Sequence, residues 1–246
     1  MMKLSKLYFL TLFILLSLWS CSKSNDEPTP DTNTGIPANA QLSSVTEATD
    51  SQGNQYSVGF DQASGNNQNP FVIKKDSQGN QVWKVTHENT GVDGRGVLLA
   101  IDSNDNPWVV FTVDGGSNDG GYITKKQVDA NAFSGVFMNS YGSGGGPKAS
   151  VIALLDPANG NIKKGTFMAA RLTSGNTNTL NITQIGFNDG NVAFEISSAA
   201  WPPGTGTSYE RFPNITDNDR VNGAFKIYYE IKTDLSEIVV ANLLTQ

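Results

Sequence analysis

A short turn sequence recurs along this chain and limits the folds that it can adopt. Asp-Ser-Gln-Gly-Asn occurs at residues 50–54 and again at 76–80, and Asp-Ser-Asn-Asp-Asn follows at 102–106. Looser versions occur at 156–161 and 188–191. Each stretch suits a tight hairpin turn, because the Asp side chain caps the turn and Gly or Asn supplies positive φ. The sequence therefore predicts a series of β-hairpins.

Runs of β-branched and aromatic residues lie between these turns, and no convincing amphipathic helix occurs after residue 40. Short runs of this composition, bounded by Gly, Asn and Asp, are typical of strands. We therefore expect an all-β fold. The clearest predicted strands are Tyr56–Phe60, Phe71–Lys75, Gln81–Thr86, Val97–Ile101, Trp108–Val113, Val151–Leu155, Thr166–Ala170, Asn191–Ile196, Phe225–Ile231 and Ile238–Leu244.

The predicted hairpins fall into two alternating types, and a pair of them makes a unit of about four strands, the size of a propeller blade. Three such units follow from the sequence, and residues 114–148 could supply a fourth. That Gly-rich segment is otherwise a connector between strands. A β-sandwich or an irregular all-β fold is the alternative. The hairpins of the first type span 44–60, 97–113 and 180–197, and those of the second span 71–86, 149–170 and 225–244.

The first of these units resembles a bacterial repeat. Its residues read VGF at 58–60, FVIKKDSQGN at 71–80 and VW at 82–83. This is similar to the bacterial β-propeller repeat that pairs a "GN-Y-V-G" hairpin with a "F-K-D-GN-W" hairpin. The similarity extends over residues 44–113. It implies a β-propeller-like arrangement of about three to four four-stranded units.

The first 20 residues have the layout of a secretory signal peptide. Lys3 and Lys6 precede an apolar run at 7–18, which is too short to span a bilayer comfortably. The run ends in Leu-Trp-Ser before Cys21, which resembles the bacterial lipobox. That resemblance implies cleavage before Cys21 and lipidation of its sulfur, so the partner expected at this end is a membrane, bound through the lipid anchor.

Residues 21–40 are expected to form a flexible linker between the lipidated cysteine and an all-β domain at 41–246, because Pro, Thr, Asn and Asp dominate them. Ser22 stands where an Asp would be expected for inner-membrane retention in the lipoproteins that this chain resembles. Residues 22–27 resemble the export signal of Bacteroidetes surface lipoproteins. These resemblances imply an outer-membrane location and exposure at the cell surface.

Charge and composition exclude several functions. The net charge is -6, and removal of the leader leaves 15 Lys and Arg against 23 Asp and Glu. An acidic surface repels phosphate backbones, so we expect no nucleic-acid partner. A single cysteine excludes an intramolecular disulfide, and a single histidine excludes zinc sites built from several His or Cys. We expect neither a metal nor a cofactor.

A long insertion at 198–222 contains the candidate ligand-binding residues. Its aromatic side chains lie beside charged ones in a loop stiffened by three prolines. Aromatic rings next to carboxylates and Arg suit stacking on sugar rings or contact with a protein. The alternative is that the rings fold back and cover the end of the β core. The candidates are Trp201, Tyr209, Glu210, Arg211 and Phe212.

Catalysis has little support in the sequence. His87 is the only histidine, it follows a predicted strand, and we expect it to be an exposed strand-end residue. No Gly-x-Ser-x-Gly elbow accompanies it. Carboxylate-pair chemistry of the glycosidase type would have to come from Glu195, Glu210, Asp217 or Glu230. The favoured function is a binding module for a glycan or a partner protein; the alternatives are a carbohydrate-active enzyme and a structural subunit of an envelope complex.

Overall fold

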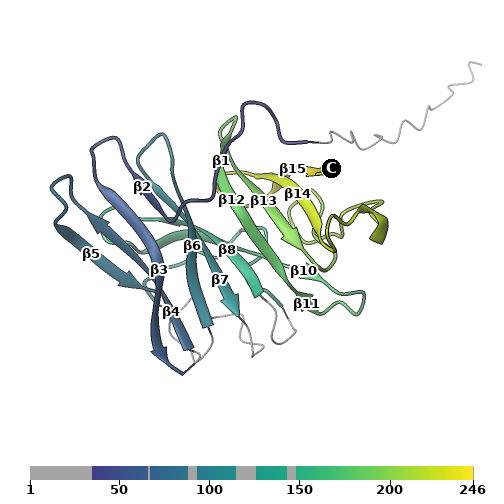
Figure 1. Cartoon of the computed structure of the whole chain (residues 1–246), viewed down its shortest axis with the longest axis horizontal. Coiled ribbons are helices and arrows are strands. Elements are labelled where there is room, and N and C mark those ends of the chain that lie inside the picture. Colours follow the sequence, from purple (N-terminus) through teal and green to yellow (C-terminus); the bar gives the residue numbers. More distant parts are fainter. Residues whose placement is uncertain (1–34, 66, 88–92, 115–125, 143–147, 246) are drawn as a thin grey trace, which may run out of the picture. The chain divides into compact units, whose positions relative to one another are not determined.

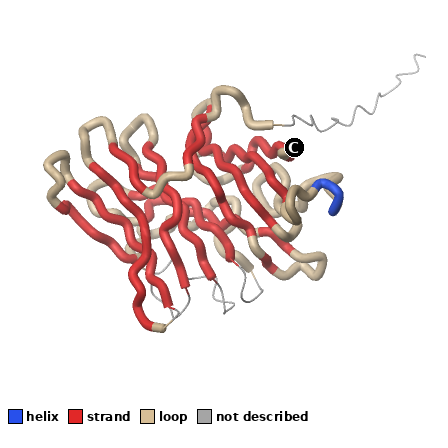
Figure 2. The backbone as a smooth tube through the Cα atoms, in the orientation of Figure 1, coloured by secondary structure: helices blue, strands red, loops and turns tan. Residues whose placement is uncertain are grey.

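The computed structural model describes residues 35–65, 67–87, 93–114, 126–142 and 148–245, and within them it confirms the all-β prediction (Figure 1). All strand pairs within the sheets are antiparallel. The described residues include one short 3-10 helix, η1 (Asp217–Asp219), and no α-helix (Figure 2). None of their helices is long and apolar enough to cross a membrane.

The strands form three larger sheets and one small hairpin. Sheet 1 contains β2 (Glu47–Thr49), β3 (Gln55–Ser64), β4 (Asn67–Lys75) and β5 (Gln81–Thr86). Sheet 2 contains β6 (Asp93–Ile101), β7 (Pro107–Asp114), β8 (Lys148–Leu155) and β9 (Ile162–Met168). Sheet 3 contains β1 (Gln41–Ser43), β12 (Leu180–Asn188), β13 (Asn191–Ser198), β14 (Phe225–Ile231) and β15 (Ile238–Leu243), and the separate hairpin pairs β10 (Ala170–Arg171) with β11 (Thr177–Asn178).

Each hairpin predicted from the sequence joins two neighbouring strands of one sheet, so each sheet holds one hairpin of each type. The turn chemistry that we expected is present. The Asp50 carboxylate accepts hydrogen bonds from the backbone N–H groups of Gln52 and Asn54, at 3.0 and 2.8 Å. Asp76 makes the same pair of contacts in the next copy. In the third copy Asp105, rather than Gly or Asn, adopts the positive φ of 62°.

The core lies between the sheets, with sheet 2 packed against both of the others. Strand β6 packs against β3 and β4 of sheet 1, and β12 packs against β6, β7 and β8. Hydrogen bonds between turns reinforce the packing: Ser51 donates to the Asp105 carboxylate from its backbone N–H at 2.8 Å and from its hydroxyl at 2.6 Å. The largest fully buried side chains are Trp108, Tyr56, Tyr228, Tyr229, Phe111, Phe167, Phe194, Phe225, Leu99 and Ile152.

The described part of the glycine-rich insertion, residues 126–142, packs on the core, so the interpretation as a simple connector is wrong for these residues. The ring of Phe133 lies 5.6 Å from that of Phe167 in β9, and the ring of Tyr141 lies 5.9 Å from it. The backbone N–H of Met138 bonds to the Thr166 hydroxyl at 3.0 Å. The segment forms no additional four-stranded sheet within the described residues.

Residues 35–43, which we name the N-terminal strap, run from a contact with β15 to β12, where residues 41–43 pair as β1 at the edge of sheet 3. Asn242 of β15 donates to the Gly35 carbonyl at 2.9 Å, and Asn39 donates to Asp189 at 3.0 Å. A Cβ added at Gly186 of β12 would lie 1.6 Å from the Gln41 carbonyl oxygen, so only glycine fits there. Residues 35–40, which the sequence places in the linker, therefore contact the β domain.

The strap contacts sheet 3 beside a buried polar cluster. By register, Gly186 and Glu230 point to one side of sheet 3. The Glu230 carboxylate is 4% exposed and accepts hydrogen bonds from Asn188 at 2.7 Å, Tyr228 at 2.9 Å and Asn191 at 3.0 Å. We call these four side chains the Glu230 cluster. A buried carboxylate is tolerated in such a place because three donors replace the water that it loses.

Candidate functional site

The loop after β13 is held to the β domain by backbone contacts at two points in its first part. Trp201 exchanges two backbone hydrogen bonds of 2.9 Å with Arg171 of β10, and Gly206 exchanges two of 2.9 Å with Ile238 of β15. Within the loop, the Phe212 N–H bonds to the Pro202 carbonyl at 2.9 Å. The loop therefore folds back on itself and is ordered by backbone contacts rather than only by its prolines.

The aromatic side chains of this loop pack against the end of the core, which was the alternative left open by the sequence. Trp201, Tyr209 and Phe212 are half-buried and contact the buried cluster. The Tyr209 hydroxyl donates to the Trp201 carbonyl at 2.9 Å, and the Trp201 indole N–H donates to the Thr173 hydroxyl at 3.2 Å. These contacts fix the orientations of the two largest rings.

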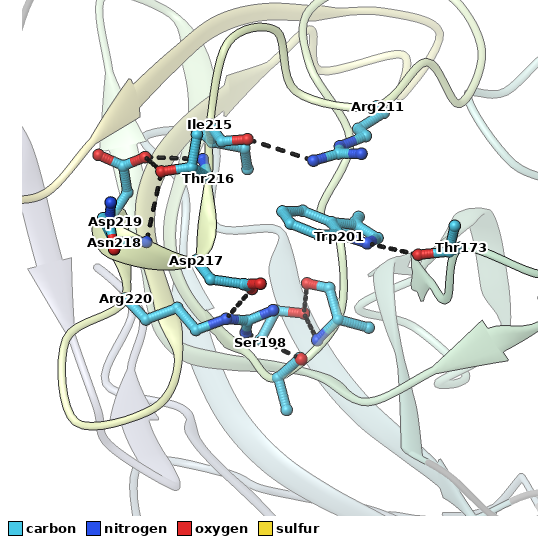
Figure 3. Close-up of polar contacts among 12 residues, drawn as sticks. Thr173, Ser198, Trp201, Arg211, Ile215, Thr216, Asp217, Asn218, Asp219 and Arg220 are labelled. Atoms are coloured by element: carbon cyan, nitrogen blue, oxygen red, sulfur yellow. Dashed lines mark hydrogen bonds and ion pairs between the residues drawn. The ribbon is translucent and has the colours of Figure 1, made fainter.

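Three arginines cover the rings. The Arg211 guanidinium carbon lies 3.4 Å from the centroid of Trp201, and that of Arg171 lies 4.2 Å from Tyr209. The Arg220 guanidinium carbon lies 4.0 Å from the ring of Phe225, which itself lies 5.2 Å from Trp201. Figure 3 shows the Trp201 ring between Arg211 and Arg220. We name the set of Arg171, Trp201, Tyr209, Arg211, Arg220 and Phe225 the aromatic–arginine site.

The three arginines differ in how their charge is balanced. Arg220 pairs with the Asp217 carboxylate at 2.8 Å and also donates to the Ala199 carbonyl at 2.9 Å. Arg211 donates to the Ile215 carbonyl at 3.2 Å. Within the described part of the chain, no carboxylate forms an ion pair with Arg171 or Arg211. Neither guanidinium group therefore has an ion-paired carboxylate among the described residues.

The Tyr209 ring lies 4.2 Å from the Arg171 guanidinium carbon. Burial raises the pKa of its hydroxyl, while the positive charges of Arg171 and Arg211 act in the opposite direction.

No family model matches the chain, and no curated protein matches it either. The interpretation of the aromatic–arginine site therefore depends on its own geometry.

The structure places the five sequence-predicted site residues in one loop but gives them different surroundings. Trp201, Tyr209 and Phe212 contact the core, Arg211 is exposed above Trp201, and the Glu210 side chain is exposed. Sequence reasoning missed two members of the site, Arg171 and Phe225, and included Arg220 only as a charged neighbour of the aromatic residues in the insertion. Arg220 lay in the same insertion, beside Asp217, but Arg171 and Phe225 come from β10 and β14, and no local pattern connects them to the loop.

The carboxylates that the sequence offered for catalysis are engaged in structural contacts, apart from Glu210. Glu230 belongs to the buried cluster beside the strap, and Glu195 accepts a hydrogen bond from Gln184 at 3.0 Å. Asp217 pairs with Arg220. No group of three or more His, Cys, Asp or Glu among the described residues could hold a metal ion. Cys21, the predicted lipidation site, lies outside the described residues.

The prediction that His87 is exposed is wrong. Its side chain is fully buried, and its ring lies 5.1 Å from the ring of Phe111. The backbone N–H of His87 bonds to the Pro70 carbonyl at 3.0 Å, which continues the pairing of β5 with β4 and carries the side chain into the core. An imidazole in this position is a packing residue, and the sequence could not show it because the residues covering it come from other strands.

The burial of His87 makes stability depend on pH. Burial lowers the pKa of His87 from 6.5 to about 4, helped by the charge of Lys126 and opposed by a backbone contact to Lys126. Between these two pKa values His87 is protonated in the unfolded chain but neutral in the folded protein. The free energy of unfolding therefore falls as the pH falls. We expect the free energy of unfolding to lose about 3 kcal/mol from this residue between neutral pH and the folded-state pKa.

Urea denaturation of the wild type and of His87→Leu across that pH range measures this contribution. Carboxylates contribute to both proteins equally, so the difference between the two curves isolates the histidine. Below pH 6.5, the ordinary pKa of histidine, the free energy of unfolding should fall more for the wild type than for His87→Leu. Parallel curves would show that the ring is not held neutral in the folded state.

Proposed function

We propose that this chain is a lipid-anchored protein of the outer membrane whose β domain faces the cell exterior and binds a partner protein through the aromatic–arginine site. The proposal joins the leader and Cys21 at one end of the sequence to an ordered surface loop in the β domain. The observation that carries the binding function is the fixed geometry of Trp201, Tyr209 and Arg211 in an exposed loop. These are the residue types that supply most of the binding energy at protein interfaces.

We also infer that the three sheets are blades of a propeller-like arrangement. Three observations support this. The strands of each blade are consecutive in the sequence, apart from β1, which adds to the third sheet. Neighbouring sheets pack on each other in chain order, because β6 of sheet 2 contacts β3 and β4 of sheet 1, and β12 of sheet 3 contacts β6 and β8 of sheet 2. Loops of such an arrangement lie at the edges of the blades, where the 199–224 segment is available to a partner.

A protein partner is supported better than a glycan. Stacking on a sugar requires an open ring face, and Arg211 lies 3.4 Å above the ring of Trp201. Exposed Leu172, 44% accessible, follows Arg171 directly and extends the surface with an apolar side chain. An ordered loop also binds with a smaller loss of conformational entropy than a flexible one.

The anchor is tested by mass spectrometry and cell fractionation. The mature protein should begin at a lipidated Cys21 and sediment with the outer membrane, whereas Cys21→Ala should lose the lipid and leave that fraction. Protease added to intact cells should cleave the wild type. A full-length, unmodified polypeptide in the soluble fraction would contradict the proposed location.

The binding function is tested by crosslinking on intact cells followed by identification of captured proteins. Trp201→Ala should reduce capture of a specific partner about tenfold, because it removes the ring on which Arg211 rests. Trp83→Ala is the matched control, since Trp83 is a half-buried tryptophan in sheet 1. Equal capture by all three proteins would contradict the proposed surface.

A further inference from the structure

Resting on this proposed function, we propose that Arg171 and Arg211 form a paired guanidinium site that binds the carboxylates of an acidic protein segment. The two arginines are separated by 39 intervening positions in the sequence, and the backbone bridges Arg171–Trp201 and Pro203–Arg211 place Arg171 beside the loop that carries Arg211. Acidic side chains are thus the chemical class of ligand that we assign to the aromatic–arginine site.

The stacked geometry leaves the donors of both arginines available. A guanidinium that lies over an aromatic ring uses its flat face for that contact, and its N–H groups then point outward in the plane. Arg211 uses one donor for the Ile215 carbonyl. The ring contact holds the guanidinium plane in a fixed orientation. In that orientation the guanidinium can donate two parallel hydrogen bonds to one carboxylate.

The charge balance points to an anion. Among the described residues, Lys84, Arg220 and Lys232 pair with a carboxylate, at 2.8, 2.8 and 2.5 Å, whereas Lys75 and several other cations do not. Arg171 and Arg211 have no ion pair with a described carboxylate either, and unlike Lys75 each is held over an aromatic ring, Tyr209 and Trp201 respectively. Guanidinium groups without an ion-paired carboxylate are stabilised when a ligand supplies the negative charge.

The surroundings of the pair favour a protein carboxylate over other anions. The net charge of -6 opposes every polyanion, so the two arginines suit a short acidic segment better than a long polyphosphate chain such as a nucleic acid. Leu172, beside Arg171, offers an apolar contact that an acidic peptide can use with its own side chains. Glu210 is exposed between Tyr209 and Arg211 in the sequence, and its charge opposes an acidic ligand.

The test measures binding of a fluorescent poly-L-glutamate peptide to the soluble domain with its ordered strap, with poly-L-glutamine of equal length as the uncharged control. The wild type should bind poly-L-glutamate more weakly at high salt than at low salt. Arg171→Gln and Arg211→Gln should each weaken binding about tenfold, and Arg211→Lys should restore little of it. Glu210→Gln should strengthen binding, and Lys75→Gln, an exposed cation on β4, should leave it unchanged.

The outcomes separate this inference from the proposed function. Affinity that does not change on substitution of either arginine would overturn the inference, while loss of partner capture by Trp201→Ala would still support the proposed function. Binding of polygalacturonate in place of poly-L-glutamate, through the same arginines, would also overturn it, because the ligand would then be a polysaccharide. Thermal unfolding of each variant, with Arg211→Lys as the charge-preserving one, distinguishes lost binding from lost folding.

Discussion

The Trp108→Ala variant is expected to lose about 4 kcal/mol in its free energy of unfolding, the typical cost of removing a buried tryptophan. Trp108 is 1% exposed in β7, and its ring meets Phe187 of β12 edge-on at 6.3 Å, so it joins sheet 2 to sheet 3. Its indole N–H also donates to the Asp102 carboxylate at 3.0 Å. The substitution therefore leaves a cavity between two sheets and removes a contact from the turn that precedes its strand.

Two further variants separate these contributions. Trp108→Phe keeps most of the ring and removes the donor, so we expect a loss of about 1 to 2 kcal/mol. Burial acts to raise the pKa of Asp102, but hydrogen bonds from Trp108 and Asn106 outweigh it and hold that pKa below its ordinary value. The Asp102 pKa measured by NMR should therefore rise in Trp108→Phe. An unchanged Asp102 pKa, or a loss in Trp108→Ala no larger than in the half-buried Trp83→Ala, would contradict this role.

The Glu230→Leu variant is expected to lose about 3 to 5 kcal/mol, because two buried donors, Asn188 and Tyr228, and the half-buried Asn191 would remain without an acceptor. Asn188 and Tyr228 donate to one carboxylate oxygen, at 2.7 and 2.9 Å, and Asn191 donates to the other at 3.0 Å. Burial, followed by the contact with Glu230, raises the pKa of Tyr228, so this hydroxyl stays a donor at neutral pH. Leucine has a similar volume but supplies no acceptor.

Chemical denaturation of Glu230→Leu beside Glu195→Leu measures this effect. Glu195 lies on the same face of sheet 3 as Glu230, one strand away, but it is less buried and accepts one side-chain hydrogen bond. Its replacement should cost less than about 1 kcal/mol. Proteolysis within residues 35–43 should also become faster in Glu230→Leu, because Asn39 of the strap bonds to Asp189, the neighbour of Asn188 in the cluster. Similar losses in the two variants would show that the cluster stabilises nothing beyond an ordinary surface glutamate.

The fold class was predictable because hairpins are local. Each turn sequence contains its own capping Asp and its own positive-φ residue, so Asp50 and Gly53 act within five residues of each other. The alternation of two hairpin types likewise predicted which strands pair, since neighbouring strands of a sheet are joined by these turns. The packing of sheet on sheet, through β6 and β12, lay beyond these local patterns.

The candidate site was predictable in part, for the same reason. The insertion at 198–222 was visible as aromatic residues among prolines, and it holds Trp201, Tyr209 and Arg211. The arrangement of charge was not visible, because Arg171 reaches Tyr209 from a different hairpin. For His87 the local sequence led to a wrong prediction. Its position after a strand suggested exposure, but its burial depends on the strands packed above it.

By itself, the sequence determined the all-β class, the hairpin pairing and the expectation of a leader that ends at Cys21, since each depends on residues close together along the chain. The tertiary structure alone decided the burial of the Glu230 cluster, the burial of His87 and the position of Arg171 beside the loop that carries Arg211. Those features arise from contacts between segments far apart in sequence, and such contacts exist only once the sheets have packed.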